Sequence, residues 1–186
     1  MPIFIIEHLD SKVFQWSFLE YRHVSQIVGK ENIWFTNTNS RRLARFGRVI
    51  PESVTTMQLK NVCLLDLAAS QTLESKEAKV FEYYIFGGIL GDHPAAGRTK
   101  KLLADRVSCA VQRNLGLDQF STDTAVLVVK KIIEGNSLSQ IQFIPLIEVH
   151  TKFGESVILP YHYVLENGKP VVAPGLIEML TNQETF

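Results

Sequence analysis

The chain has 186 residues, of which 46% are hydrophobic and 20% charged, and its 19 lysines and arginines balance its 19 aspartates and glutamates. This length and composition fit one domain with a sizeable core, and the zero net charge weighs against a stand-alone nucleic-acid binder. The N-terminal segment MPIFIIEHLD has no basic region of a signal peptide, and no run of 18 apolar residues could cross a membrane. We therefore expect a cytoplasmic protein.

The predicted elements alternate between strands and helices. Short apolar runs predict buried strands at 3–6, 33–36, 62–65 and 83–86. Helical periodicity predicts helices at 14–28 (capped by Asp10 or Ser11), 40–47, 99–113, 121–133 and 174–180. Segment 141–149 resembles a strand interrupted by Pro145, and Asn167-Gly168 predicts a hairpin. The alternation indicates an α/β fold with a mainly parallel sheet flanked by helices.

The two cysteines also bear on the environment of the protein. Cys63 and Cys109 lie in apolar surroundings and lack the CxxC spacing of a metal or redox motif. We expect two buried free thiols in a reducing compartment. The five histidines show no metal spacing either, so no metal site is predicted.

Polar residues follow three of the predicted strands. Glu7 ends the first, Asp66 the third, and the glycine-rich segment FGGILGDHPAAGRT follows the fourth. Because ligands bind beyond the carboxyl ends of parallel strands, we expect these polar ends to converge on one site. Glycines would let backbone amides approach a ligand there.

Taken alone, each motif near these strand ends is ambiguous. GGILG lacks the GxGxxG of a dinucleotide site and the GK[ST] of a P-loop, and glycine pairs more often serve turns. In NLGLDQFSTDTAV, Ser121 or Thr122 is a good helix N-cap. The amides at that helix start could receive a carboxylate or hydroxyl of a ligand, or the segment could be an ordinary capped helix.

Together, YIFGGILGDHP, NLGLDQFSTDTA and LPYHYVLENGKPVVAPGLIEML resemble the SPOUT methyltransferases. The resemblance covers nearly the whole chain and is greatest to a small branch containing a fungal ribosomal-protein arginine methyltransferase. It implies one SPOUT-like domain over residues 1–186, with a C-terminal trefoil knot that binds S-adenosylmethionine in a bent conformation. It also implies either a monomer or a homodimer paired through the knot helices.

The resemblance places the cofactor between three loops, where the backbone would read the adenine and Leu90 and Leu115 would pack on it. The implied cofactor-binding residues are Leu65, Gly87, Gly88, Ile89, Leu90, Gly91, Asp92, Leu115, Gln119, Phe120, Ser121, Thr122 and Thr124. Arg98 and His93 are the implied substrate-binding residues.

Methylation of an arginine requires carboxylates that hold the guanidinium by paired charge-assisted bonds. Asp92 is the first candidate for this catalytic role, because it follows the glycine loop directly, and Glu7 and Asp66 are the second. A helix or turn cap is the alternative role for Asp92.

The predicted function is methyl transfer from S-adenosylmethionine to an arginine of a small-subunit ribosomal protein. The alternatives are a SPOUT methyltransferase acting on rRNA or tRNA, and a non-catalytic cofactor-binding module associated with the ribosome. Arg41, Arg42, Arg45 and Arg48 form a basic cluster. They are either a solvated helix face or a contact with ribosomal RNA or an acidic partner.

Overall fold

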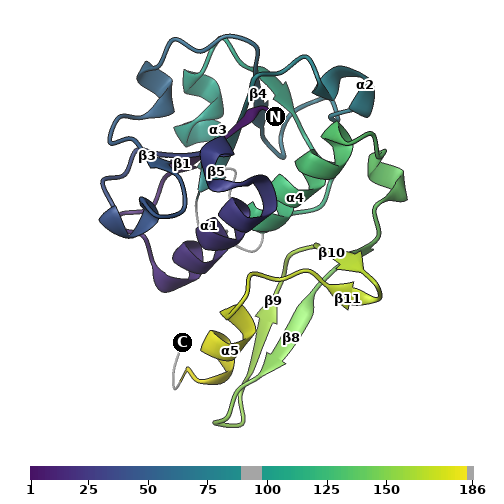
Figure 1. Cartoon of the computed structure of the whole chain (residues 1–186). Coiled ribbons are helices and arrows are strands. Elements are labelled where there is room, and N and C mark those ends of the chain that lie inside the picture. The colour runs from purple at the N-terminus through teal and green to yellow at the C-terminus, as the bar shows by residue number, and fades with distance from the viewer. Residues whose placement is uncertain (89–97, 184–186) are drawn as a thin grey trace.

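The computed structural model describes residues 1–88 and 98–183 and is built on a six-stranded sheet whose strand pairs are all parallel (Figure 1). In spatial order the strands are β3 (Arg48–Val49), β2 (Ile33–Thr36), β1 (Ile3–His8), β5 (Tyr83–Gly88), β4 (Val62–Leu65) and β6 (Val111–Arg113). The predicted mainly parallel α/β fold is confirmed. Strands β1, β5 and β4, which carry the predicted polar ends, are direct neighbours.

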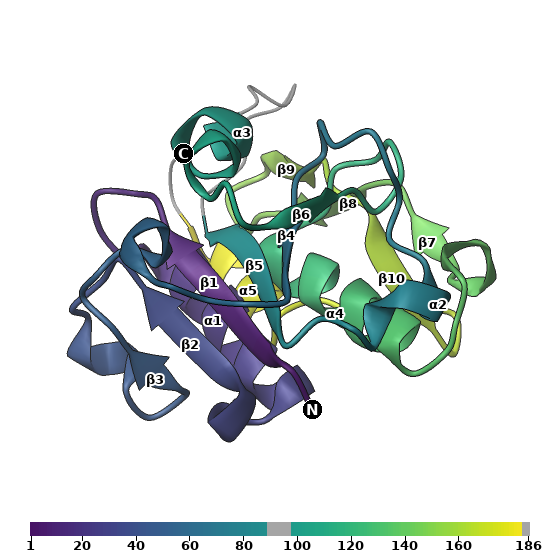
Figure 2. The same ribbon diagram turned by 90° about the horizontal axis from the view of Figure 1, so that it is seen from above.

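Helices cover both faces of this sheet because the strand side chains alternate between the faces. On one face, Phe4 and Ile6 of β1 pack in a core shared with α1 (Gln15–Val28) and α4 (Thr122–Ile133). On the other, Ile5 and Ile85 pack against the segment formed by α3 (Arg98–Leu102) and η4 (Ala104–Arg106). Figure 2 shows α3 apart from α1 and α4, with the sheet between them.

The C-terminal part adds two small antiparallel sheets and a helix, seen below the large sheet in Figure 1. Its elements are β7 (Phe143–Ile144), β8 (Ile147–His150), β9 (Ser156–Leu159), β10 (Tyr163–Glu166), β11 (Lys169–Pro170) and α5 (Leu176–Thr181). A core containing Leu19, Tyr163 and Leu176 joins this part to α1. The predicted Asn167-Gly168 hairpin is confirmed between β10 and β11.

Short helices complete the chain: η1 (Lys30–Asn32), η2 (Arg41–Leu43), η3 (Val54–Thr56), α2 (Ser75–Ala78) and η5 (Leu138–Gln140). Among the helices of the described ranges, none is long and apolar enough to cross a membrane.

Several local predictions were wrong. The helix expected at 99–113 ends early, because Val111 pairs with Cys63 as the start of β6 and is 40% exposed instead of buried. The i, i+4 spacing of Leu103 and Val107 suits a helix, but the residues that follow pair with the free edge of β4 and form a strand. Cys109 is exposed, so only Cys63 is a buried thiol. Helix α1 has its N-cap at Phe14 instead of Asp10 or Ser11.

The glycines that end β5 make room for the protein's own side chains. A Cβ on Gly88 would overlap the Tyr21 hydroxyl and lie 2.6 Å from Cγ2 of Ile6, and a Cβ on Gly87 would lie 2.9 Å from Oγ1 of Thr99. These contacts give both glycines a packing role, and their role at the cofactor stays a prediction. Glycine is required because α1 and α3 approach the strand closely.

We predict that Gly88→Ala destabilises the protein by about 1–3 kcal/mol, because the added methyl group overpacks the contact with Tyr21 and Ile6. Urea unfolding measures this loss. In the Tyr21→Phe background the same substitution should cost less, because the nearest atom, the hydroxyl, is gone. Equal losses in both backgrounds would contradict the assigned contact.

Candidate active site

The buried carboxylate of Glu7 lies at the carboxyl end of β1 and joins three segments. Thr36 Oγ1 and Ser53 Oγ each donate a hydrogen bond of 2.5 Å to it, and the amide of Val54 donates one of 3.0 Å. The side chain is held between β1, the end of β2 and η3, and Glu7 is only 1% exposed. This arrangement gives Glu7 a structural role, and its catalytic role stays a prediction.

Asp66 directly follows β4 and shapes the turn there. Its Oδ1 accepts a hydrogen bond from the amide of Ala68 at 3.2 Å, and its own amide donates to the carbonyl of Arg113 at 2.9 Å. The carboxylate therefore organises the turn after β4, and the backbone of Asp66 ties that turn to the end of β6. It lies at the predicted edge of the sheet, beside Leu65.

The loop after β6 is anchored by Asn114, the first residue of the NLGLDQFSTDTAV segment, for which no role was predicted. Its Nδ2 donates to the carbonyl of Ala69, and its Oδ1 accepts from Thr72 Oγ1 and from the amide of Gly116. These bonds tie the loops after β4 and β6 together. Leu115, a predicted cofactor residue, is thereby held buried near Leu65 in the same core. An asparagine directly before a glycine-containing loop is a turn signal that could have indicated this role.

The other end of this loop is held by the C-terminal part of the chain. The amide of His162 donates to the carbonyl of Gln119 at 2.9 Å, and Phe120 forms a parallel bridge with His162. The ring of Phe120 lies 5.2 Å from that of Phe143. Gln119 and Phe120, both predicted at the cofactor, therefore lie where the C-terminal strands meet the large sheet.

Consecutive residues of α1 connect the start of α4 with the end of β5. Glu20 hydrogen-bonds the backbone and side chain of Thr122 at the start of α4. Tyr21 packs against Gly88 and bonds Nδ1 of His8 at 2.9 Å. Ser121 holds the N-cap position but makes no capping bond with its side chain.

Glu20 belongs to a buried polar cluster with His23 and Asp123. Nδ1 of His23 lies 2.7 Å from Oδ2 of Asp123, whose Oδ1 accepts a hydrogen bond of 2.7 Å from Ser121. Burial and the nearby Asp123 raise the pKa of Glu20 to about 8, against the opposing hydrogen bonds from Trp16 and Thr122. Glu20 is therefore protonated at neutral pH, and the cluster avoids two adjacent buried charges.

The described residues thus bring together most of the predicted cofactor positions. Leu65, Gly87 and Gly88 lie at the strand ends. The positions in the segment 114–124 are Leu115, Gln119, Phe120, Ser121, Thr122 and Thr124. Ile89, Leu90, Gly91, Asp92 and His93 lie outside the described residues, as does the side chain of Arg98.

Unsatisfied polar atoms mark this region as fit for a polar ligand. In the described part of the chain, four buried side-chain atoms have no hydrogen-bond partner: His8 Nε2, Ser17 Oγ, Arg22 Nε and Tyr163 Oη. His8 ends β1, Ser17 and Arg22 lie on α1, and Tyr163 lies on β10. Native proteins rarely leave such groups unpaired, and His8 Nε2, at the end of β1, is the one that lies at the predicted edge of the sheet, where it favours a polar ligand.

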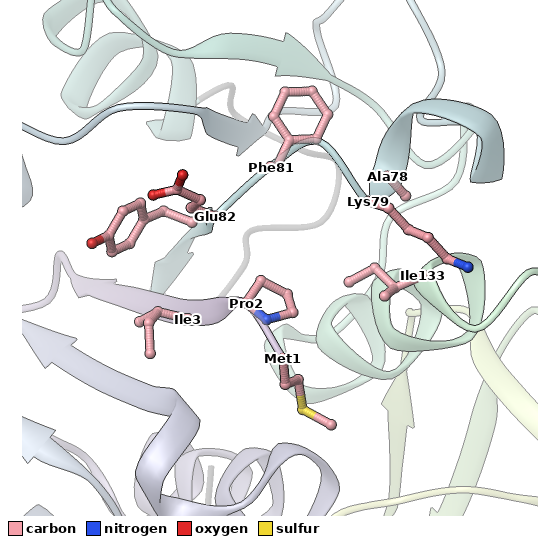
Figure 3. Close-up of a pocket in the computed structure, with 9 residues that line it drawn as sticks. Met1, Pro2, Ile3, Ala78, Lys79, Phe81, Glu82 and Ile133 are labelled. Carbon is pink, nitrogen blue, oxygen red and sulfur yellow. The ribbon is translucent and has the colours of Figure 1, made fainter.

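A separate hollow of about 440 Å³ lies at the opposite end of the strands. Its lining residues, shown in Figure 3, are Met1, Pro2, Ile3, Ala78, Lys79, Phe81, Glu82, Tyr83 and Ile133. Ile3 and Tyr83 are the first residues of β1 and β5, so the hollow is distinct from the ligand edge of a parallel sheet. Within 1–88 and 98–183, no group of three His, Cys, Asp or Glu side chains could hold a metal ion.

The architecture defines the class of protein first. The structure matches that of the dual specific Trm10 from Thermococcus kodakaraensis with a TM-score of 0.59 at 19% identity, over 75% of this chain and 96% of that chain. At this identity the likeness shows the fold, which is the SPOUT type that the sequence resemblance implied.

The particular family follows from closer relatives. Residues 3–185 match the model of the family "Protein arginine N-methyltransferase SFM1-like". The chain is 32% identical to protein arginine N-methyltransferase SFM1 of Saccharomyces cerevisiae, over 95% of this chain and 93% of that protein. The crystal structure of yeast SFM1 complexed with SAM matches with a TM-score of 0.86 at 31% identity, over 97% of this chain and 90% of that one. The chain belongs to the SFM1-like family of protein arginine N-methyltransferases.

The raised pKa of Glu20 predicts how stability depends on pH. Its carboxyl group binds a proton more tightly in the folded protein than in the unfolded chain, where the pKa is near 4.5. Stability should therefore fall as the pH rises from about 5 to 8, by at most ~1.4 kcal/mol per pH unit for one proton. Glu20→Gln, which stays neutral, should remove this dependence and be more stable than wild type at pH 8.

Urea unfolding between pH 5 and 9 measures the effect. Glu134→Gln is the matched control, because Glu134 is exposed at the end of α4 and pairs only with Lys130 among the described residues. This variant should keep the wild-type pH dependence. Parallel stability curves for wild type and Glu20→Gln would refute the assigned proton.

Proposed function

We propose that this protein transfers a methyl group from S-adenosylmethionine to an arginine side chain of a small-subunit ribosomal protein in the cytoplasm. The methyltransferase class and its cofactor follow from the family and from the SAM complex of yeast SFM1. The observation that carries the proposal is the meeting of three strand ends with the start of α4, where the buried Nε2 of His8 lacks a partner. The trefoil knot of SPOUT enzymes belongs to the same proposal and is supported by the likeness to Trm10.

When bound, S-adenosylmethionine would supply an electrophilic methyl group on a sulfonium. The protein's task is to align the acceptor nitrogen with that group, to exclude water and to receive a proton. Leu65 and Leu115 provide apolar surface for the adenine side, and Gln119 to Thr122 provide backbone polar groups. In this proposal, Asp92 and Arg98 position the substrate.

Two alternatives to this function are an RNA methyltransferase and a non-catalytic cofactor-binding module. An RNA methyltransferase would use the same fold, as the Trm10 likeness illustrates, but the family and the yeast relative are named for protein arginine. A non-catalytic module would bind the cofactor without turnover. The net charge of zero gives little general attraction to RNA and favours a protein acceptor.

A ridge of arginines suggests how the protein finds its acceptor on the ribosome. The arginine ridge consists of Arg41, Arg42, Arg45 and Arg48, all exposed at the β3 edge of the sheet. None of the four forms an ion pair with another described residue. This arrangement supports a contact with ribosomal RNA.

Aromatic rings hold three of these guanidinium groups in place. Arg42 lies 4.2 Å from the ring centre of Phe18, Arg48 lies 5.0 Å from that of Trp34, and Arg45 lies 5.7 Å from that of Phe46. Arg42 also donates a hydrogen bond of 3.0 Å to Oε1 of Gln15. Arginines held against rings lose less freedom on binding, and their remaining N–H groups can reach phosphate oxygens. The β3 edge is three strand spacings from β5, about 15 Å, so RNA at the ridge would leave the predicted site open.

We predict that labelled methyl groups enter an arginine of a small-subunit ribosomal protein. The assay incubates enzyme and labelled S-adenosylmethionine with ribosomal subunits from cells lacking the enzyme, separates RNA from protein, and hydrolyses the protein to identify the residue. Label that resists protease and disappears with ribonuclease would establish the RNA alternative. Cofactor binding by calorimetry without any label would establish the non-catalytic alternative.

The arginine ridge gives a second prediction. Arg41→Ala with Arg45→Ala should weaken binding to an rRNA fragment and reduce the slope of log K against log salt by roughly 0.7–0.9 for each phosphate that is no longer neutralised. Fluorescence anisotropy measures both effects. Lys60→Ala with Lys79→Ala removes the same charge elsewhere on the surface and should change the slope less. Equal effects of the two double substitutions would mean that net charge, and not the arginine ridge, attracts RNA. If the ridge variant keeps its RNA binding but binds an acidic protein more weakly, the ridge contacts an acidic protein partner instead.

A further inference from the structure

His8 is fixed at the end of β1, directly beside the end of β5. It lies in register with Gly88, and the amide of Leu9 donates to the carbonyl of Gly88 at 3.0 Å. Its own carbonyl accepts a hydrogen bond of 2.7 Å from Nδ2 of Asn37. The backbone around His8 is therefore held from both neighbouring strands, and Gly88 is the last residue described before the predicted loop at 89–97.

Only one nitrogen of the His8 ring is used. Nδ1 lies 2.9 Å from the hydroxyl of Tyr21, and the two rings are perpendicular. Nε2 is buried and has no partner, and the residue as a whole is 3% exposed. A buried nitrogen without a hydrogen bond is costly, and sites of chemistry are where such atoms are expected.

The other candidate bases at these strand ends are engaged in structure. The carboxylate of Glu7 accepts three hydrogen bonds, and Asp66 closes the turn after β4. Of the described side chains that end β1, β4 and β5, only His8 keeps a buried polar atom without a partner.

The geometry points to a catalytic role for His8: its free Nε2 receives the proton that the substrate guanidinium loses when it takes the methyl group. Substrate entry must uncover this nitrogen, because the side chain is almost fully buried. This inference rests on the proposed arginine chemistry but not on which protein carries the arginine.

The acceptor nitrogen gives its electron pair to the methyl carbon, the carbon–sulfur bond breaks with its pair on sulfur, and the proton moves from nitrogen to Nε2. A free guanidinium is far too weak an acid for imidazole, but the nitrogen becomes strongly acidic as the nitrogen–carbon bond forms. A neutral imidazole then suffices as general base, and the imidazolium returns the proton to solvent.

The surroundings of His8 keep it neutral, as this role requires. Burial lowers its pKa below the usual 6.5, although the charges of Asp10 and Glu7 and the nearby backbone of Lys12 oppose the shift. The titratable group facing it from α1 is Tyr21, whose pKa is raised well above 10 by burial, so it stays neutral. The role requires the tautomer in which Nδ1–H donates to the Tyr21 oxygen and Nε2 carries the lone pair.

The test compares His8→Gln with wild type on whichever protein fraction the wild type labels. Affinity for S-adenosylhomocysteine by calorimetry should stay within threefold. The methylation rate should fall at least about 100-fold, and the decline of the wild-type rate below pH 6.5 should be lost. His150→Gln is the matched control, because His150 is exposed on β8 and bonds Ser156, and it should leave all three readouts unchanged.

A long-range ¹H–¹⁵N spectrum of the wild type provides a readout that needs no substrate. At pH 7.5 it should show His8 protonated on Nδ1 and free on Nε2. A His8→Gln variant that binds S-adenosylhomocysteine and methylates at the wild-type rate would overturn the proposal. If His8→Gln does not bind S-adenosylhomocysteine, the tautomer of His8 in the wild type tests the proposal. A proton on Nε2 overturns the proposal, and an Nε2 without a proton supports it. Absence of any label with the wild type would refute the proposed function instead, and the tautomer would still test this one.

Discussion

The contacts of Glu20 and Tyr21 on α1 determine how the rest of the site is assembled. Glu20 bonds Thr122 at the start of α4, and Tyr21 fills the space beside Gly88 at the end of β5. These are two of the three loops that the family resemblance assigns to the cofactor, and one turn of one helix fixes their relative positions. Because neighbouring helix residues point about 100° apart, a helix lying between two loops can contact both with adjacent side chains.

This arrangement buries polar groups that a purely structural interface would avoid. Glu20, His23 and Asp123 lie together between α1 and α4, and burial next to Asp123 keeps a proton on Glu20 near neutral pH. Replacing such clusters by apolar side chains is often neutral or stabilising in other proteins. The cluster is therefore better explained by the need to hold the start of α4 in one position than by stability.

Charge is distributed unevenly although the chain is neutral as a whole. Acidic side chains gather at the ends of β1 and β4 with Glu7 and Asp66, whereas the arginine ridge lies at the β3 edge. A cationic guanidinium suits the first region and a phosphate backbone the second.

The sequence alone determined the fold class, the strands that end in polar residues, and the helix that starts after Ser121. These follow from local signals: buried strands are continuous apolar runs, and helix starts carry capping residues. It failed at 99–113, where i, i+4 spacing looks helical but the chain adds β6 to the sheet edge, and it did not reveal that Gly88 is kept bare by Tyr21. Only the tertiary structure decided which buried groups are paired and which are left free. Glu20 and His8 acquire their roles from Thr122 and Tyr21, which are not their neighbours in the sequence, and no local pattern records such contacts.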